Sequence, residues 1–118
     1  MSTDYIIEKE HIQKINEMCG GSVRTDAEIE TALDLGKGKA VYTKIAYLWR
    51  AILVGHTFTD GNKRTALGVA LTILKSYRIR VTPASQVRLV NIAVRIAREN
   101  REDVNQIERL IRYAVEGH

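Results

Sequence analysis

The sequence predicts an all-α domain of about six helices. Helix-favouring Ala, Ile, Leu, Arg and Glu are plentiful, whereas proline occurs once and aromatic residues make up 6% of the chain. Apolar residues recur every three or four positions, as expected of helices with one buried face. The 118 residues are enough for one hydrophobic core, so residues 1–118 are predicted to form a single domain.

The N-terminal third predicts two short helices after an irregular lead-in at residues 1–6. The first covers residues 8–19 and ends at two consecutive glycines. The second begins at residues 25–28, which fit a capping box, and runs to about Leu35. The next segment is too rich in glycine for a helix, and a plain connecting loop is one of two interpretations of Lys37, Gly38, Lys39, Ala40, Val41 and Tyr42.

Two apolar helices are predicted on either side of residues 55–65. The helix that follows this segment is apolar almost all round, which is typical of the buried centre of a domain. The helix that precedes it carries one apolar stripe, made by Ile45, Leu48, Trp49 and Ile52 at positions i, i+3, i+4 and i+7.

The C-terminal part predicts two further helices after an extended link or short strand at residues 78–81. Thr82 is expected to cap the first of them, with proline at its first position and the apolar residues Val87, Val90, Val94 and Ala97 on one side. Asp103 is expected to cap the last helix. The many arginines here are interpreted as solvated, some of them paired with Glu99, Glu102 and Glu108, with a nucleic-acid surface as the minor alternative.

A polar cluster occupies the loop between the two central helices. It consists of His56, Asp60, Gly61, Asn62, Lys63 and Arg64. The turn at Asp60-Gly61-Asn62 predicts that the following helix starts near Asn62 or Lys63. A helix start has unpaired N–H groups and partial positive charge, so it binds anions, and two cations placed there need an anionic ligand. The cluster therefore indicates a phosphate site.

Two side chains of the cluster add chemistry to phosphate binding. The carboxylate of Asp60 would be repelled by a polyphosphate unless Mg²⁺ lies between them, because Mg²⁺ combines one or two carboxylates with phosphate oxygens. His56 is suited to proton abstraction near neutral pH. Taken singly, each part of the cluster has a structural interpretation. His56 could be a histidine at a helix end, Asp60-Gly61 a simple turn, and Lys63-Arg64 a solvated pair of cations. Together they predict phosphoryl or nucleotidyl transfer with a general base.

Residues 56–64, His-Thr-Phe-Thr-Asp-Gly-Asn-Lys-Arg, resemble the Fic/Doc family signature H-x-F-x-[D/E]-G-N-G-R. The continuation Asn-Lys-Arg-Thr-Ala-Leu, residues 62–67, is similar to the death-on-curing (Doc) branch. The resemblance implies that His56 activates a target hydroxyl and that Asp60 holds Mg²⁺. It implies that ATP is the nucleotide and that its phosphates contact Gly61, Asn62, Lys63 and Arg64. It also implies that residues 37–42 form a hairpin flap that docks the target segment as an added strand.

Two departures from the signature favour phosphate transfer over AMP transfer. Relatives that transfer AMP have a second glycine where this chain has Lys63, and a second arginine where it has Leu67. In the Doc branch, the lysine goes with a reversed nucleotide, so that the γ-phosphate is transferred. We therefore expect a toxin-type protein kinase, with a translation elongation factor as the first target to try and AMP transfer as the alternative.

Composition limits the remaining classes of function. Cys19 is the only cysteine, so no internal disulfide can form, and neither a membrane span nor a signal peptide is evident. We expect a cytoplasmic protein. The net charge of +4 favours an acidic partner without requiring nucleic acid. Many relatives restrain themselves with a helix that pairs with the arginine missing here at Leu67, and no such helix is evident. The Doc resemblance therefore implies restraint by a separate antitoxin protein. A non-enzymatic, arginine-rich DNA-binding module is the alternative from another class.

Overall fold

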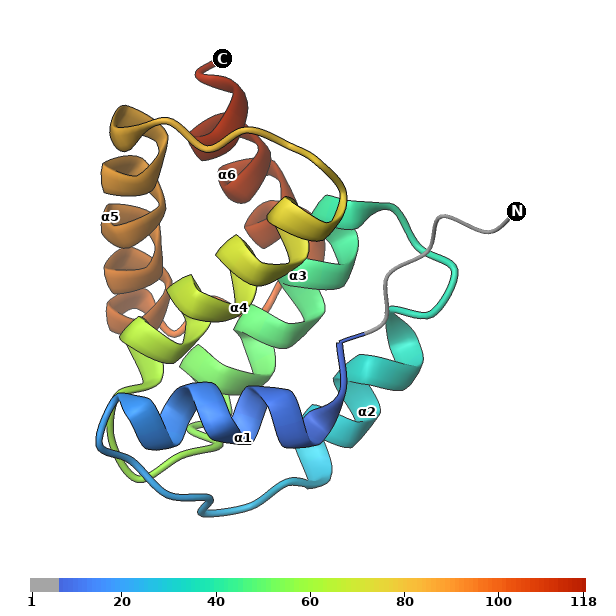
Figure 1. The fold of residues 1–118 in the computed structure, drawn as a ribbon, viewed down its shortest axis with the longest axis vertical. Helices are drawn as coiled ribbons and strands as arrows, with labels where there is room; N and C mark the ends of the chain where they lie inside the picture. Colours follow the sequence, from blue (N-terminus) through green and yellow to red (C-terminus); the bar gives the residue numbers. More distant parts are fainter. Residues whose placement is uncertain (1–6) are drawn as a thin grey trace.

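The computed structural model describes residues 7–118, and the expected lead-in at residues 1–6 lies outside them. Within the described part, the chain forms six α-helices and one π-helical turn (Figure 1). This confirms the predicted fold class. The elements are α1 (Lys9–Met18), α2 (Ala27–Leu35), α3 (Val41–Trp49), the π-turn η1 (Arg50–Val54), α4 (Asn62–Ser76), α5 (Pro83–Glu99) and α6 (Val104–Glu116).

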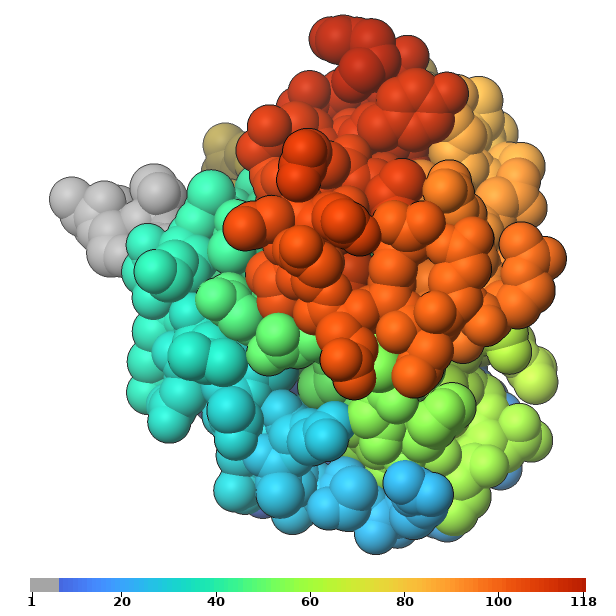
Figure 2. Space-filling model, turned by 180° about the vertical axis from the view of Figure 1, so that it is seen from behind, coloured from blue at the N-terminus to red at the C-terminus, as the bar shows by residue number. Residues whose placement is uncertain are grey.

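The helices α3 and α4 form the centre of the molecule. They run side by side, with α5 on one flank, α2 on the other, α6 behind them and α1 crossing below them (Figure 1). From behind, α6 covers much of the face and leaves only a narrow strip of α3 and η1 visible beside α2 (Figure 2). The predicted stripe, which runs through α3 into η1, is buried throughout, since Ile45, Leu48, Trp49 and Ile52 are each at most 3% exposed.

The C-terminal helices begin at the predicted caps. The Thr82 hydroxyl accepts a hydrogen bond from the Ser85 N–H at 3.0 Å, and the Asp103 carboxylate accepts from the N–H groups of Asn105 and Gln106. Residues 78–81 form no strand, because Arg78 belongs to the turn that ends α4, with φ of 59°, and residues 79–81 are irregular. The buried face of α5 differs from the predicted one. Val87, Val90 and Val94 are exposed, because Leu89, Ile92, Ala93 and Ile96 fill the core instead.

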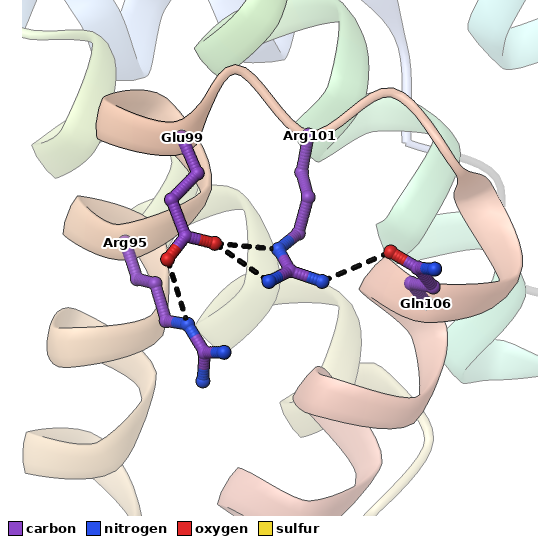
Figure 3. Close-up of polar contacts among 4 residues, drawn as sticks. All are labelled: Arg95, Glu99, Arg101 and Gln106. Carbon is purple, nitrogen blue, oxygen red and sulfur yellow. Dashed lines mark hydrogen bonds and ion pairs between the residues drawn. The ribbon is translucent and has the colours of Figure 1, made fainter.

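Ion pairs hold the junction of α5 and α6. The Glu99 carboxylate accepts hydrogen bonds from Arg101 and from Arg95, and Arg101 also donates to Gln106 (Figure 3). The Arg101 guanidinium, followed by Arg95, lowers the pKa of Glu99. Arg112 pairs with Glu108 in α6. These contacts confirm that several of the C-terminal arginines pair with acids, and they reduce the charge available to a nucleic acid.

The hairpin expected at residues 37–42 is wrong. Residues 36–38 form a turn, and Val41 and Tyr42 already belong to the first turn of α3. The β-favouring character of these two residues is overridden because Tyr42 is buried against the rest of the core. The capping box at residues 25–28 is also wrong. α2 begins one residue later than the box requires, with Asp26 and not Thr25 at the cap position, and Asp26 makes no cap hydrogen bond but pairs with Lys9 at 3.3 Å.

The buried position of Tyr42 predicts an alkaline loss of stability. Burial, together with the negative charge of Glu116, raises the pKa of Tyr42 in the folded protein. Stability from the neutral phenol is therefore present below the ordinary tyrosine pKa of about 10 and is lost as the pH rises through the raised value. We expect Tyr42→Phe to flatten the decline of unfolding free energy above pH of about 10, measured by denaturant titration. An equal flattening in Tyr113→Phe, which removes an exposed tyrosine, would contradict this.

No helix within residues 7–118 is long and apolar enough to cross a membrane.

Candidate active site

The π-turn η1 leads directly into the loop that carries the polar cluster. Its last hydrogen bond runs from the Gly55 N–H to the Arg50 carbonyl over 3.1 Å. The next carbonyl, of Ala51, accepts from the hydroxyl of Thr57 at 2.9 Å, and Thr57 is fully buried. A π-turn is uncommon and occurs often at functional sites. Here it ends the helix and turns the chain sharply just before the histidine.

His56 occupies the outer side of this turn. Its side chain is exposed, and its backbone lies in the left-handed region with φ of 50°. Such a conformation costs a residue with a side chain roughly 1–2 kcal/mol. The buried neighbours Thr57 and Phe58 hold the conformation, since they anchor the loop on its inner side. Strained backbone held by a rigid surround is a feature of functional sites. The imidazole is therefore exposed to solvent and is not buried in the core.

Asn62 fixes the middle of the loop. Its side-chain oxygen accepts from the Phe58 N–H at 3.3 Å, and its side-chain nitrogen donates to the Phe58 carbonyl at 3.0 Å. The amide that we assigned to a phosphate thus holds the loop backbone. A phosphate contact of Asn62 remains a prediction, and its backbone N–H, in the first turn of α4, is the group best placed for it.

Asp60 and Gly61 form the tight turn before α4. One Asp60 carboxylate oxygen accepts from the Gly61 N–H at 2.8 Å, and the side chain is exposed. Gly61 has φ of 73°, and a Cβ at this position would lie 3.0 Å from both the Cβ and the carbonyl oxygen of Cys19. The conformation therefore favours glycine here, and the close approach of Cys19 adds to that preference. The turn leaves the second carboxylate oxygen of Asp60 available to a metal.

The N-terminus of α4 has no side-chain cap and two nearby cations. Gly61 occupies the cap position, so no side chain caps the helix, and the first-turn N–H groups lack helical acceptors. Lys63 and Arg64 are exposed, and within residues 7–118 neither makes an ion pair or a side-chain hydrogen bond. Two unpaired cations add to the positive end of the helix dipole, where they repel it and each other. An anion would relieve that repulsion.

A segment that the sequence did not point to lies beside the loop. Residues 22–25 run antiparallel to residues 57–59, with an isolated β-bridge between Val23 and Phe58. The Thr59 N–H donates to the Ser22 carbonyl at 2.9 Å, and the Thr57 carbonyl accepts from the Arg24 N–H at 2.8 Å. The segment joins α1 to α2 and is exposed at residues 22–25. It lies along the motif loop, whereas residues 36–40 precede the far end of α3 (Figure 1).

The side chains present fit a magnesium ion that arrives with a nucleotide. Asp60 supplies one exposed carboxylate, and no group of three or more His, Cys, Asp or Glu side chains is placed to hold a metal in the described part of the chain. Mg²⁺ commonly takes one or two carboxylates and completes its shell with phosphate oxygens and water. Asp60 in front of an anion site matches that requirement.

Family comparison agrees with this geometry. The Fic/DOC family profile matches residues 6–74, which is more than half of the chain and includes the whole loop. The chain belongs to the Fic/DOC family. Fic/DOC enzymes are protein-modifying transferases that use ATP with Mg²⁺. No curated protein and no solved structure matches this Fic/DOC chain significantly.

An open cavity adjoins the motif loop. It has a volume of about 410 Å³ and is lined by α2, α3, η1 and the α5–α6 link, including Glu28, Arg50, Gly55 and Glu102. Its volume falls in the range of small-ligand sites. Gly55 contributes backbone to this cavity and is the residue before His56, so a ligand held there would lie next to the Fic/DOC loop.

Proposed function

We propose that this Fic/DOC chain is a Doc-like transferase that moves the γ-phosphate of ATP to a hydroxyl side chain of a target protein. The observation that carries the proposal is the pairing, on one rigid loop, of an exposed imidazole with an uncapped, cation-flanked helix start. His56 would take the proton of the target hydroxyl as its oxygen bonds to the γ-phosphorus. The bond from that phosphorus to the β–γ bridging oxygen would break, and ADP would leave.

The remaining loop residues would bind and orient the substrate. The first-turn amides of α4, with Lys63 and Arg64, would hold phosphate oxygens, and Asp60 would hold Mg²⁺. Bound Mg²⁺ neutralises phosphate charge and helps to align the triphosphate. Thr57 and Asn62 would not contact the nucleotide through their side chains, because both are used to fix the loop.

Phosphate transfer is favoured over AMP transfer by the residue at position 63. A lysine there places a side chain and a charge where AMP-transferring relatives have a glycine, and Leu67 replaces their second arginine. AMP transfer to a protein hydroxyl, with pyrophosphate leaving, is the alternative function. It would use the same histidine as base, so the two differ in which phosphorus the target oxygen attacks.

We further propose that the chain acts in the cytoplasm as a toxin on a protein of the translation machinery. Its activity would be restrained by a separate antitoxin protein. Residues 22–25 are exposed and pair with the loop, so they are better placed to dock a target segment than the hairpin that we expected at residues 37–42.

Labelled ATP distinguishes the two chemistries. The purified chain is incubated with Mg²⁺, proteins of a cell lysate, and ATP labelled at either the γ- or the α-phosphate. We expect label in a lysate protein from γ-labelled ATP alone. Label from α-labelled ATP would establish AMP transfer, and label from neither, in a preparation free of antitoxin, would contradict the enzyme proposal.

A further inference from the structure

Asn16 links the first helix to the motif loop across a long stretch of sequence. It lies in α1 and is fully buried. Its side-chain nitrogen donates to the Asp60 carbonyl at 2.8 Å and to the Thr65 hydroxyl at 3.0 Å. One amide therefore holds both the residue before the Gly61 turn and the first part of α4.

The orientation of this amide is fixed by its acceptors. The Asp60 carbonyl can only accept a hydrogen bond, so the nitrogen must face it, and a flipped amide would set oxygen against oxygen. The Asn16 side-chain oxygen then has no hydrogen-bond partner in the described part of the chain. A buried, unpartnered oxygen is unfavourable for stability. Packing alone therefore does not account for an amide at this buried position. Its hydrogen bonds to the loop do.

Gly21 leaves the room that this link requires. A Cβ on Gly21 would lie 2.3 Å from the Asp60 carbonyl oxygen and 2.5 Å from the Asn16 side-chain oxygen. Both distances are too short for any side chain. Only glycine at this position allows the loop and the Asn16 amide to approach the chain at the end of α1. Gly20, the preceding residue, has φ of 86° and open space around its Cβ position.

We propose that Asn16 is a positioning residue for the transfer reaction. By holding the Asp60 carbonyl, it sets the peptide plane at the start of the Gly61 turn and hence the direction of the Asp60 carboxylate. The hydrogen bond to Thr65 joins α1 to the body of α4 and is not part of the proposed role. The proposed effect of Asn16 on catalysis rests on the proposed function, whereas its effect on the position of the loop does not.

The first test measures the loop in the absence of nucleotide. Asn16→Leu removes the donor and fills its space with apolar atoms. The matched control, Thr65→Val, removes one acceptor of the same amide and leaves the Asp60 link intact. We expect amide hydrogen exchange at Phe58, Thr59 and Gly61 to accelerate at least about tenfold in Asn16→Leu alone. Similar exchange in both variants, or no acceleration in either, would overturn the proposal.

The second test measures catalysis in the same variants. In Asn16→Leu we expect kcat to fall by about 10- to 100-fold with a smaller change in the KM for ATP, because displaced groups lose reactivity more than affinity. The Mg²⁺ concentration for half-maximal rate should rise as well. Thr65→Val should stay within about threefold of wild type in kcat. A looser loop with unchanged kcat and Mg²⁺ dependence would refute the positioning role.

Gly21→Ala provides an independent route to the same effect. We expect it to reproduce the fast exchange of Asn16→Leu, and the double variant to add little, because both changes break one link. Gly20→Ala, which strains the backbone without touching the amide, should leave exchange at Phe58 and Thr59 unchanged. If the wild type transfers no label, the proposed function fails, while the exchange measurements still decide whether Asn16 holds the loop.

Discussion

Replacing His56 by alanine is expected to lower label transfer by about 10²- to 10⁴-fold, the usual contribution of a general base. The imidazole is exposed, so the fold does not depend on its packing. The loss should appear in kcat, because the base acts as the hydroxyl proton is removed and contributes little to ATP binding. The measurement is initial rate against ATP concentration with a fixed target protein.

The control for this prediction is His11→Ala. His11 is an exposed histidine on α1 and is not part of the loop. Its removal should leave kcat and KM unchanged. Full activity in His56→Ala, with an unchanged circular dichroism spectrum, would show that another group takes the proton and would remove the central role of His56.

Replacing Asp60 by asparagine is expected to raise the Mg²⁺ concentration for half-maximal rate by at least about tenfold. Loss of supporting residues around a metal typically costs 10- to 100-fold in metal affinity or activity, and a direct ligand should cost no less. Asparagine keeps the shape of the side chain and a carbonyl oxygen that can still accept from the Gly61 N–H. The effect should therefore reflect lost charge and not an altered turn.

Asp34→Asn is the matched control for the metal prediction. Asp34 is an exposed aspartate at the end of α2, where it pairs with Lys37 at 3.1 Å. Asp34→Asn changes the net charge by the same amount as Asp60→Asn. A general effect of charge on ATP binding would therefore appear in both variants. A shift in Mg²⁺ dependence of equal size in the two variants would contradict a metal role for Asp60.

Local signals account for what the sequence predicted correctly. The caps at Thr82 and Asp103 depend on atoms within three residues. The motif residues from His56 to Arg64 are contiguous, so one loop necessarily collects them. The exposure of His56 and Asp60 then follows from the burial of Thr57 and Phe58 between them. The predicted site thus needed little knowledge of tertiary structure.

The structural features that the sequence did not predict concern contacts between distant parts of the chain. The pairing of residues 22–25 with the loop and the link from Asn16 join positions far apart in sequence, so no local pattern indicates them. Tyr42 was assigned to a hairpin from the family resemblance and its β propensity, but its burial in α3 overrides that propensity. On α5, two apolar faces compete, and only the packed structure shows that Leu89 points inward while Val87 is exposed.

We propose above all that the start of α4 binds the triphosphate of ATP together with Mg²⁺. A titration of the ¹⁵N-labelled chain with Mg²⁺ and a non-hydrolysable ATP analogue, followed by amide NMR shifts, tests it directly. We predict that the largest shifts fall on the amides of Gly61, Asn62, Lys63 and Arg64, and that they weaken when Mg²⁺ is withheld. Shifts concentrated elsewhere, with these four amides unmoved at saturation, would contradict the account.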